Sequence, residues 1–169
     1  MKKVSIKYRD RLQSFLRAAL MAVATSATTM AAAEVTPAQP KTIVFVCLHG
    51  SVKSQMAAAH FNQIARERGL PFTAISRGIT PDASIPLRIR DGLALDGLAP
   101  LNDAGVSMTV EEASGASKVV AFDEVPADRR GTADVTYWSD VPLDRKDYAA
   151  TRNAIVQHLD ALMPTLMTK

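Results

Sequence analysis

Residues 43–59 (IVFVCLHGSVKSQMAAA) constrain the fold more than any other part of the chain. Four consecutive apolar residues, 43–46, predict a strand that is buried on both faces, as in a parallel sheet. A polar loop follows, and a helix is predicted to begin at about Ser54. Loop amides and a helix N-terminus together favour the binding of an anion. This stretch therefore predicts an α/β protein with an anion site at the end of a strand.

The first residue of that loop is Cys47, the only cysteine of the chain. Dipoles that hold an oxyanion also favour a thiolate over a thiol, so a cysteine at this position is suited to be a nucleophile. The alternative is a small apolar residue that closes the strand, because free cysteines are often buried in that way. The position of Cys47 at the mouth of the loop favours the nucleophile. A single cysteine also excludes an internal disulfide.

The first 33 residues have the composition of a secretory signal peptide. A basic start is followed by the apolar run 18–24, and Ala31 and Ala33 supply small residues at the −3 and −1 positions of a cleavage site. We therefore expect residues 1–33 to be a signal peptide, residues 34–40 a linker and residues 41–169 one α/β domain of an exported, periplasmic or secreted protein. An uncleaved anchor and an Arg-rich transit peptide are the alternatives. No stable membrane span is expected after cleavage.

The net charge of +3 belongs to the N-terminal segment. Residues 1–33 contain six basic residues and one acidic residue, a net charge of +5, whereas the remainder contains 14 basic and 16 acidic residues, a net charge of −2. No basic stripe with interleaved aromatic residues remains in the body of the chain, so we expect no nucleic-acid partner.

Apolar patterns along the rest of the chain alternate between strands and helices. The predicted strands are 42–46, 72–76, 118–122 and 133–138, and the predicted helices are 54–68, 110–114 and 147–163, the last ended by Pro164. Residues 82–107 predict only a short, irregular helix or two. This order predicts a four-stranded parallel sheet in a three-layer α/β/α fold. Cys47 follows the first strand and Asp140 the fourth, so we expect both at the carboxyl edge of the sheet, where ligands bind.

The segment VFVCLHGSVKSQMAAA resembles the signature of the low-molecular-weight protein tyrosine phosphatase superfamily, which includes the thioredoxin-coupled arsenate reductases. That signature is an apolar strand, a cysteine, five loop residues, an arginine and then a serine that begins a helix. Residues 76–81 and 138–142 resemble two further motifs of the family, the second of which carries its general acid. The resemblance covers about residues 41–163 and implies a flavodoxin-like fold.

The resemblance also implies an activity, the hydrolysis of phosphomonoesters through a cysteinyl-phosphate. Cys47 would be the nucleophile, Lys53 would hold the oxyanion, and Asp140 would be the general acid, with Asp144 as a second candidate. The positions that would surround the substrate are Leu48, His49, Gly50, Ser51, Val52, Lys53 and Ser54. The implied partners are a phosphate or arsenate oxyanion and a phosphorylated substrate, and no metal ion or other cofactor is implied.

Two departures from the family pattern keep other functions open. Lys53 stands where the family has arginine, and Val141 separates Asp140 from the following proline. Lysine offers a compact charge instead of a bidentate fork, which favours weak hydrolysis or an oxyanion-binding pseudophosphatase. Arsenate reduction would need an external thiol, since one cysteine cannot form a disulfide relay. The other two histidines, His60 and His158, are expected on helix surfaces.

Overall fold

The strand β1 (Lys41–Cys47) lies inside a sheet, as its four apolar residues predict. The computed structural model describes residues 39–142 and 147–167. The further elements are α1 (Lys53–Glu67), β2 (Phe72–Gly78), α2 (Leu87–Leu95), α3 (Val110–Gly115), β3 (Lys118–Ala121), α4 (Ala127–Arg130), β4 (Val135–Tyr137) and α5 (Tyr148–Met167). The sheet has the order β2-β1-β3-β4, and each neighbouring pair is parallel. The predicted four-stranded parallel sheet is confirmed.

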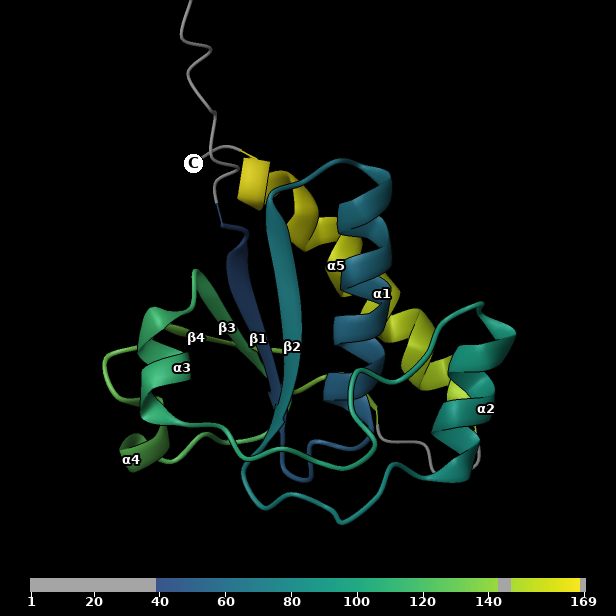
Figure 1. Ribbon diagram of the computed structural model, residues 1–169, viewed down its shortest axis with the longest axis horizontal. Coiled ribbons are helices and arrows are strands. Elements are labelled where there is room, and N and C mark those ends of the chain that lie inside the picture. The colour runs from purple at the N-terminus through teal and green to yellow at the C-terminus, as the bar shows by residue number, and fades with distance from the viewer. Residues whose placement is uncertain (1–38, 143–146, 168–169) are drawn as a thin grey trace, which may run out of the picture. The chain divides into compact units, whose positions relative to one another are not determined.

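Helices cover both faces of this sheet. In Figure 1, α1, α2 and α5 lie on one side of the strands, and α3 and α4 lie on the other. Successive residues of β1 point to opposite faces, so Ile43 and Phe45 pack in the core beneath α1 and α5. Val44 and Val46 pack in a second, smaller core that includes residues of α3. The three-layer α/β/α prediction is therefore correct.

Some helix boundaries differ from those expected. The helix α2 forms within residues 82–107, and α4 was not predicted because one turn is too short to show a helical period. The prediction that Pro164 ends the last helix was wrong, since α5 continues to Met167. A proline near a helix end removes a single backbone hydrogen bond, and the buried Leu166 keeps the last turn against the core. None of the helices in the described ranges has the length and apolarity to cross a membrane.

A partly buried polar cluster joins α1, the end of α2 and α5. His60 is buried and not on the helix surface as predicted, and its Nε2 lies 3.4 Å from Asp96 Oδ2. Asp96 also accepts a hydrogen bond from the Tyr148 hydroxyl (2.8 Å) and lies 3.4 Å from Arg152. Burial lowers the pKa of His60, and the nearby Asp96 carboxylate opposes that effect. The cluster therefore fixes how the three helices pack.

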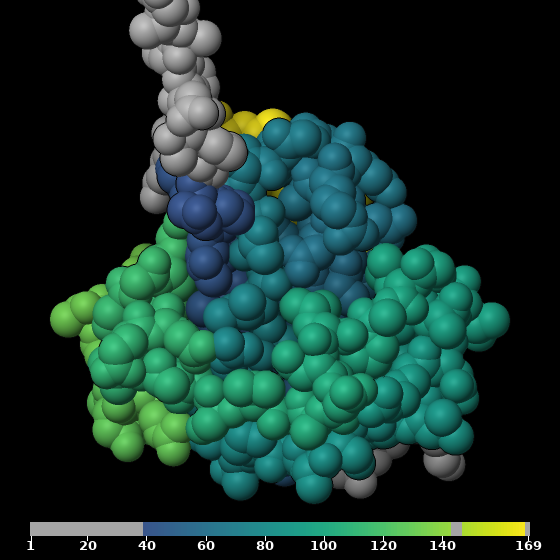
Figure 2. Space-filling view, in the orientation of Figure 1, coloured from purple at the N-terminus to yellow at the C-terminus, as the bar shows by residue number. Residues whose placement is uncertain are grey.

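The long segment between β2 and α3 packs along the carboxyl edge of the sheet. It spreads across the lower part of the molecule in Figure 2, in teal and green. It returns to the sheet at a parallel bridge between Gly78 and Ser107. On the way, the amide of Asp82 donates to the carbonyl of His49 (3.0 Å), and the amide of Gly105 donates to the carbonyl of Asp82 (2.8 Å). The loop after β1 is thus bordered by residues that are distant in sequence.

Candidate active site

The loop between β1 and α1 turns around the sulfur atom of Cys47. The Gly50 amide donates a hydrogen bond to Cys47 Sγ (3.2 Å), and Ser54 Oγ lies 3.1 Å from the same sulfur. Ser54 Oγ accepts a hydrogen bond from Ser76 Oγ (3.0 Å), which leaves its own hydrogen for the sulfur. Donors that converge on a sulfur atom stabilise negative charge on it. The Gly50 amide and the Ser54 hydroxyl group thus both lie within hydrogen-bond distance of the sulfur.

The shape of this loop depends on two glycines that meet backbone to backbone. Gly50 has φ +64°, a conformation that favours glycine. A Cβ atom on Gly50 would lie 2.9 Å from the amide nitrogen of Gly78, and one on Gly78 would lie 2.8 Å from that of Gly50. The carbonyl of Gly50 accepts a hydrogen bond from the buried Gln55 side chain (3.2 Å). These contacts turn the Gly50 carbonyl away from the sulfur and its amide toward it.

The cation of the loop, Lys53, is buried and paired with an acid. Its Nζ lies 3.5 Å from the Phe122 carbonyl oxygen, 3.5 Å from Asp123 Oδ1 and 5.5 Å from the centre of the Phe122 ring. The other oxygen of Asp123 accepts a hydrogen bond from the Leu48 amide (2.8 Å). Asp123 thus engages both the first loop amide and the loop cation.

Sequence reasoning missed Asp123, although one feature pointed to it. Asp123 lies two residues beyond β3, so it follows the carboxyl end of a strand as Asp140 does. The parallel topology brings such residues to one edge. A search for polar residues after every predicted strand would have included it.

A second missed residue, Asp82, lies beside the loop. Ser51 Oγ donates a hydrogen bond to Asp82 Oδ2 (2.5 Å), and His49 Nδ1 lies 3.3 Å from Asp82 Oδ1. His49 Nδ1 is also 3.3 Å from the carbonyl oxygen of Thr80, and its side chain is half exposed. His49 therefore forms part of the rim. No pattern in the sequence distinguishes Asp82 from other loop acids.

Asp140 lies beyond β4, at the sheet edge where β1 ends at Cys47. Its carboxylate is 72% exposed and is paired with His158 Nε2, which lies 2.9 Å from one oxygen and 3.1 Å from the other. His158 is partly exposed on α5, and its ring stacks on Trp138 with centroids 4.8 Å apart. Among the described residues, the Asp140 side chain makes no hydrogen bond to the loop that follows β1. Asp144, the second candidate acid, lies outside the described residues.

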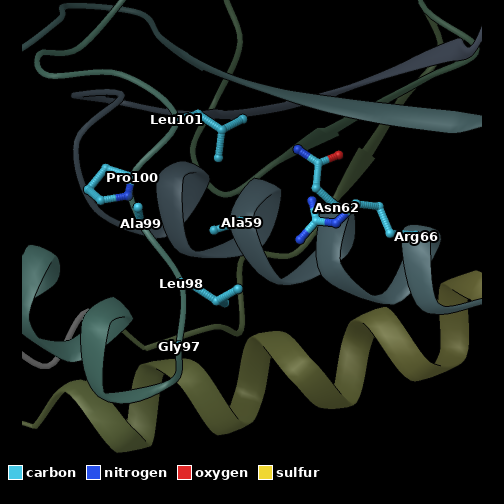
Figure 3. A pocket seen from close by; sticks show the side chains of 8 residues that line it. All are labelled: Ala59, Asn62, Arg66, Gly97, Leu98, Ala99, Pro100 and Leu101. Atoms are coloured by element: carbon cyan, nitrogen blue, oxygen red, sulfur yellow. The ribbon is translucent and has the colours of Figure 1, made fainter.

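A separate hollow lies between α1 and residues 97–101 and does not contain Cys47. Figure 3 shows Asn62 and Arg66 on α1 facing Leu98 and Leu101 across it, and the full lining is Ala59, Asn62, Arg66, Gly97, Leu98, Ala99, Pro100 and Leu101. The Asn62 side-chain amide already forms hydrogen bonds with both backbone groups of Ala74.

Within the described part of the chain, no group of three His, Cys, Asp or Glu side chains could hold a metal ion. The cysteine loop is therefore the stronger candidate site.

The fold and the loop together define a class of α/β protein in which amides, a serine and a buried cation surround a single cysteine at the carboxyl edge of a parallel sheet. The chain belongs to the low molecular weight phosphotyrosine protein phosphatase family, whose model matches residues 42–129. The matched range includes the whole cysteine loop and Asp123, whereas Asp140 lies beyond it. No curated protein matches the chain.

Solved structures of low sequence identity share the fold. YfkJ from Bacillus subtilis is 18% identical with a TM-score of 0.66, over 76% of this chain and 96% of that one. A protein tyrosine phosphatase from Entamoeba histolytica is 14% identical with a TM-score of 0.64, over 76% and 97% of the two chains. A thioredoxin-dependent arsenate reductase from Corynebacterium glutamicum is 16% identical with a TM-score of 0.63, over 78% and 64%. These likenesses bear on the fold, and the loop geometry bears on the chemistry.

Proposed function

We propose that the chain hydrolyses phosphomonoesters through a cysteinyl-phosphate on Cys47. The observation that carries this proposal is the convergence of the Gly50 amide and Ser54 Oγ on Cys47 Sγ, at 3.2 Å and 3.1 Å. A structural cysteine needs no such donors, whereas a nucleophilic thiolate is stabilised by them. Family membership supports a phosphate-containing substrate.

The proposed reaction has two steps. The Cys47 thiolate attacks phosphorus, the bond from phosphorus to the leaving oxygen breaks, and Asp140 gives that oxygen a proton. Water then attacks phosphorus, Asp140 takes a proton from it, and the bond from phosphorus to sulfur breaks to release phosphate and the thiolate. The equatorial oxygens would be held by Lys53 and by the amides of Leu48, His49, Gly50, Ser51, Val52 and Lys53.

Lys53 makes slow turnover the expected behaviour. An arginine can make two charge-assisted hydrogen bonds to the phosphoryl group, whereas a lysine at the same position makes one. The loss of the other bond costs about 1.5–3 kcal/mol. If the bond forms mainly in the transition state, this corresponds to a rate loss of about tenfold to a hundredfold. The pairing of Lys53 with Asp123 at 3.5 Å adds to the same expectation. It also favours the alternative of a pseudophosphatase that binds an oxyanion without turnover.

Arsenate reduction is the weaker alternative. The arsenate reductase of similar fold is thioredoxin-dependent, and a relay of that kind needs more cysteines than Cys47. An external small thiol could act on a Cys47–arsenate adduct. Arsenate-dependent oxidation of glutathione by the protein would promote this function.

The test is hydrolysis of an aryl phosphate at mildly acidic pH by the full chain. We expect slow release of phosphate that is abolished in Cys47→Ser and about tenfold faster in Lys53→Arg. Lys41→Arg, at the opposite end of β1, is the matched control and should leave the rate unchanged. Absence of turnover in both the wild type and Lys53→Arg would refute hydrolysis. Phosphate binding that persisted in that case would support the binding module.

A further inference from the structure

We infer that His158 is a positioning residue that holds the carboxylate of Asp140 for proton transfer to the leaving group. This inference rests on the proposed hydrolysis and adds a specific role to it. His158 belongs to α5, whereas Asp140 follows β4, so the pair joins two parts of the chain at one edge of the sheet. His158 Nε2 lies 2.9 Å and 3.1 Å from the two carboxylate oxygens, so the ring contacts both ends of the carboxylate.

The imidazole ring of His158 is itself fixed in place. It stacks on the Trp138 ring, with centroids 4.8 Å apart and planes 18° apart. Trp138 is buried and packs against Phe45 and Phe122, at centroid distances of 5.7 Å and 5.8 Å. Phe122 in turn lies beneath the ammonium group of Lys53. The ring that orients Asp140 is therefore part of the same packed unit as the residues around the cysteine loop.

The backbone on either side of Asp140 is also restrained. The Trp138 amide donates to the Ala121 carbonyl (2.8 Å), and the Val141 amide donates to the Trp138 carbonyl (3.3 Å). Val141 is buried, so the residue that separates Asp140 from Pro142 anchors the turn to the core. With the backbone fixed, the remaining freedom of Asp140 lies in its own side chain. That is the freedom which His158 restricts.

An exposed ion pair between two mobile side chains contributes little free energy, because ordering both side chains costs entropy. Here the imidazole is ordered by stacking before it meets the carboxylate, so much of that cost is absent. The Asp140 side chain keeps 72% of its surface exposed, so a carboxylate held by His158 stays open to a substrate. This combination of a fixed partner and an open carboxylate is what a general acid requires.

The test compares two aryl phosphates with the full chain. Phenyl phosphate needs protonation of its leaving oxygen, whereas 2,4-dinitrophenyl phosphate does not, because dinitrophenolate leaves readily as an anion. We expect His158→Phe, which keeps a ring against Trp138 but no donor, to lower kcat/KM for phenyl phosphate about tenfold and that for the dinitrophenyl ester less than about twofold. His158→Gln, which keeps a donor, should recover most of the loss. Gln157→Ala, at the exposed neighbouring position, is the control.

A double variant makes the result decisive. In an Asp140→Asn background, His158→Phe should cause no further loss, since the two residues act through one group. An equal loss for both substrates, or a gain for either, would overturn the positioning role. Hydrolysis of both esters that His158→Phe leaves unchanged would refute this inference alone. Absence of hydrolysis in both the wild type and Lys53→Arg would refute the proposed function and this inference with it.

Discussion

The Nζ atom of Lys53 lies 3.5 Å from a carboxylate oxygen of Asp123, so the cation of the loop is paired within the protein. The second oxygen of Asp123 accepts the Leu48 amide, which is the first amide after Cys47. In the proposed reaction this loop binds an oxyanion, yet a carboxylate already contacts two of its positive groups. An incoming phosphate would compete with Asp123 for the same positive groups.

Asp123→Asn should strengthen the binding of inorganic phosphate. Asparagine can still accept the Leu48 amide through its side-chain oxygen, but it removes the negative charge beside Lys53. A partly exposed ion pair has a net worth of up to about 1 kcal/mol, which corresponds to roughly fivefold in the dissociation constant. Isothermal titration with phosphate would measure this change.

Glu124→Gln is the matched control for that experiment, because Glu124 is exposed and is the next residue in the chain. It should leave phosphate affinity within about twofold of the wild type, since exposed charges are screened by salt. Weaker phosphate binding in Asp123→Asn would contradict competition. It would show instead that Asp123 holds Lys53 in its working position.

Gly78→Ala should distort the backbone of the cysteine loop without changing any side chain that takes part in the proposed reaction. The added Cβ would lie 2.8 Å from the Gly50 amide nitrogen, and backbone cannot yield as a flexible side chain can. We expect a loss of about 1–3 kcal/mol in the free energy of unfolding and loss of phosphate binding. Urea denaturation and phosphate titration would measure the two effects.

Gly115→Ala is the control for this substitution, because no atom lies within 4 Å of its added Cβ. Gly115 is the last residue of α3, where alanine is tolerated better than glycine. Its stability should equal or slightly exceed that of the wild type. Normal phosphate affinity in Gly78→Ala would show that the loop does not depend on the contact between the two glycines.

The sheet and the position of Cys47 at its carboxyl edge could be predicted from the sequence because both depend on local patterns. Apolar residues 43–46 specify a buried parallel strand, and Cys47 follows at once. Parallel topology then places the residue after each strand at one edge. The same reasoning predicted that Asp140 lies at that edge, and it could have been applied to Asp123.

Contacts between distant residues could not be predicted in the same way. His60 has a helical neighbourhood like that of any surface histidine, and its burial depends on Asp96, which follows α2, and on Arg152 of α5. His158 on α5 stacks on Trp138, which directly follows β4, and no local pattern encodes that contact. Helix continuation past Pro164 likewise depends on packing of the last turn.

We propose that the protein is exported and cleaved after Ala33, and this can be tested directly. Small residues at Ala31 and Ala33 fit the specificity of signal peptidase. Intact-mass analysis of the periplasmic or secreted fraction should give a chain that begins at Glu34. A bulky charged residue in Ala33→Arg should block cleavage, whereas Ala27→Ser, farther from the cleavage position, should not. A full-length product found inside the cell would contradict export.

Glu112→Gln should destabilise the fold at neutral pH and have a smaller effect in acid. The Arg77 guanidinium donates to both oxygens of Glu112, with its Nε 2.9 Å from each. These hydrogen bonds, more than any other influence, lower the pKa of Glu112 below its ordinary value of 4.5. The stabilisation is therefore present above pH 4.5 and is lost as the pH falls through the lower pKa of the folded state. Urea denaturation at pH 7 should show a loss of about 1–2 kcal/mol.

Urea denaturation repeated at lower pH tests whether the contribution of Glu112 to stability is lost in acid. The gap in unfolding free energy between wild type and Glu112→Gln should narrow below pH 4.5, because the wild-type carboxylate becomes protonated and the ion pair with Arg77 is lost. Glu111→Gln provides the control, since Glu111 is exposed in the same first turn of α3. It should shift stability by less than about 0.5 kcal/mol at either pH. A gap that stays constant with pH would contradict a contribution from the charge of Glu112, because glutamine can still accept the Thr109 amide.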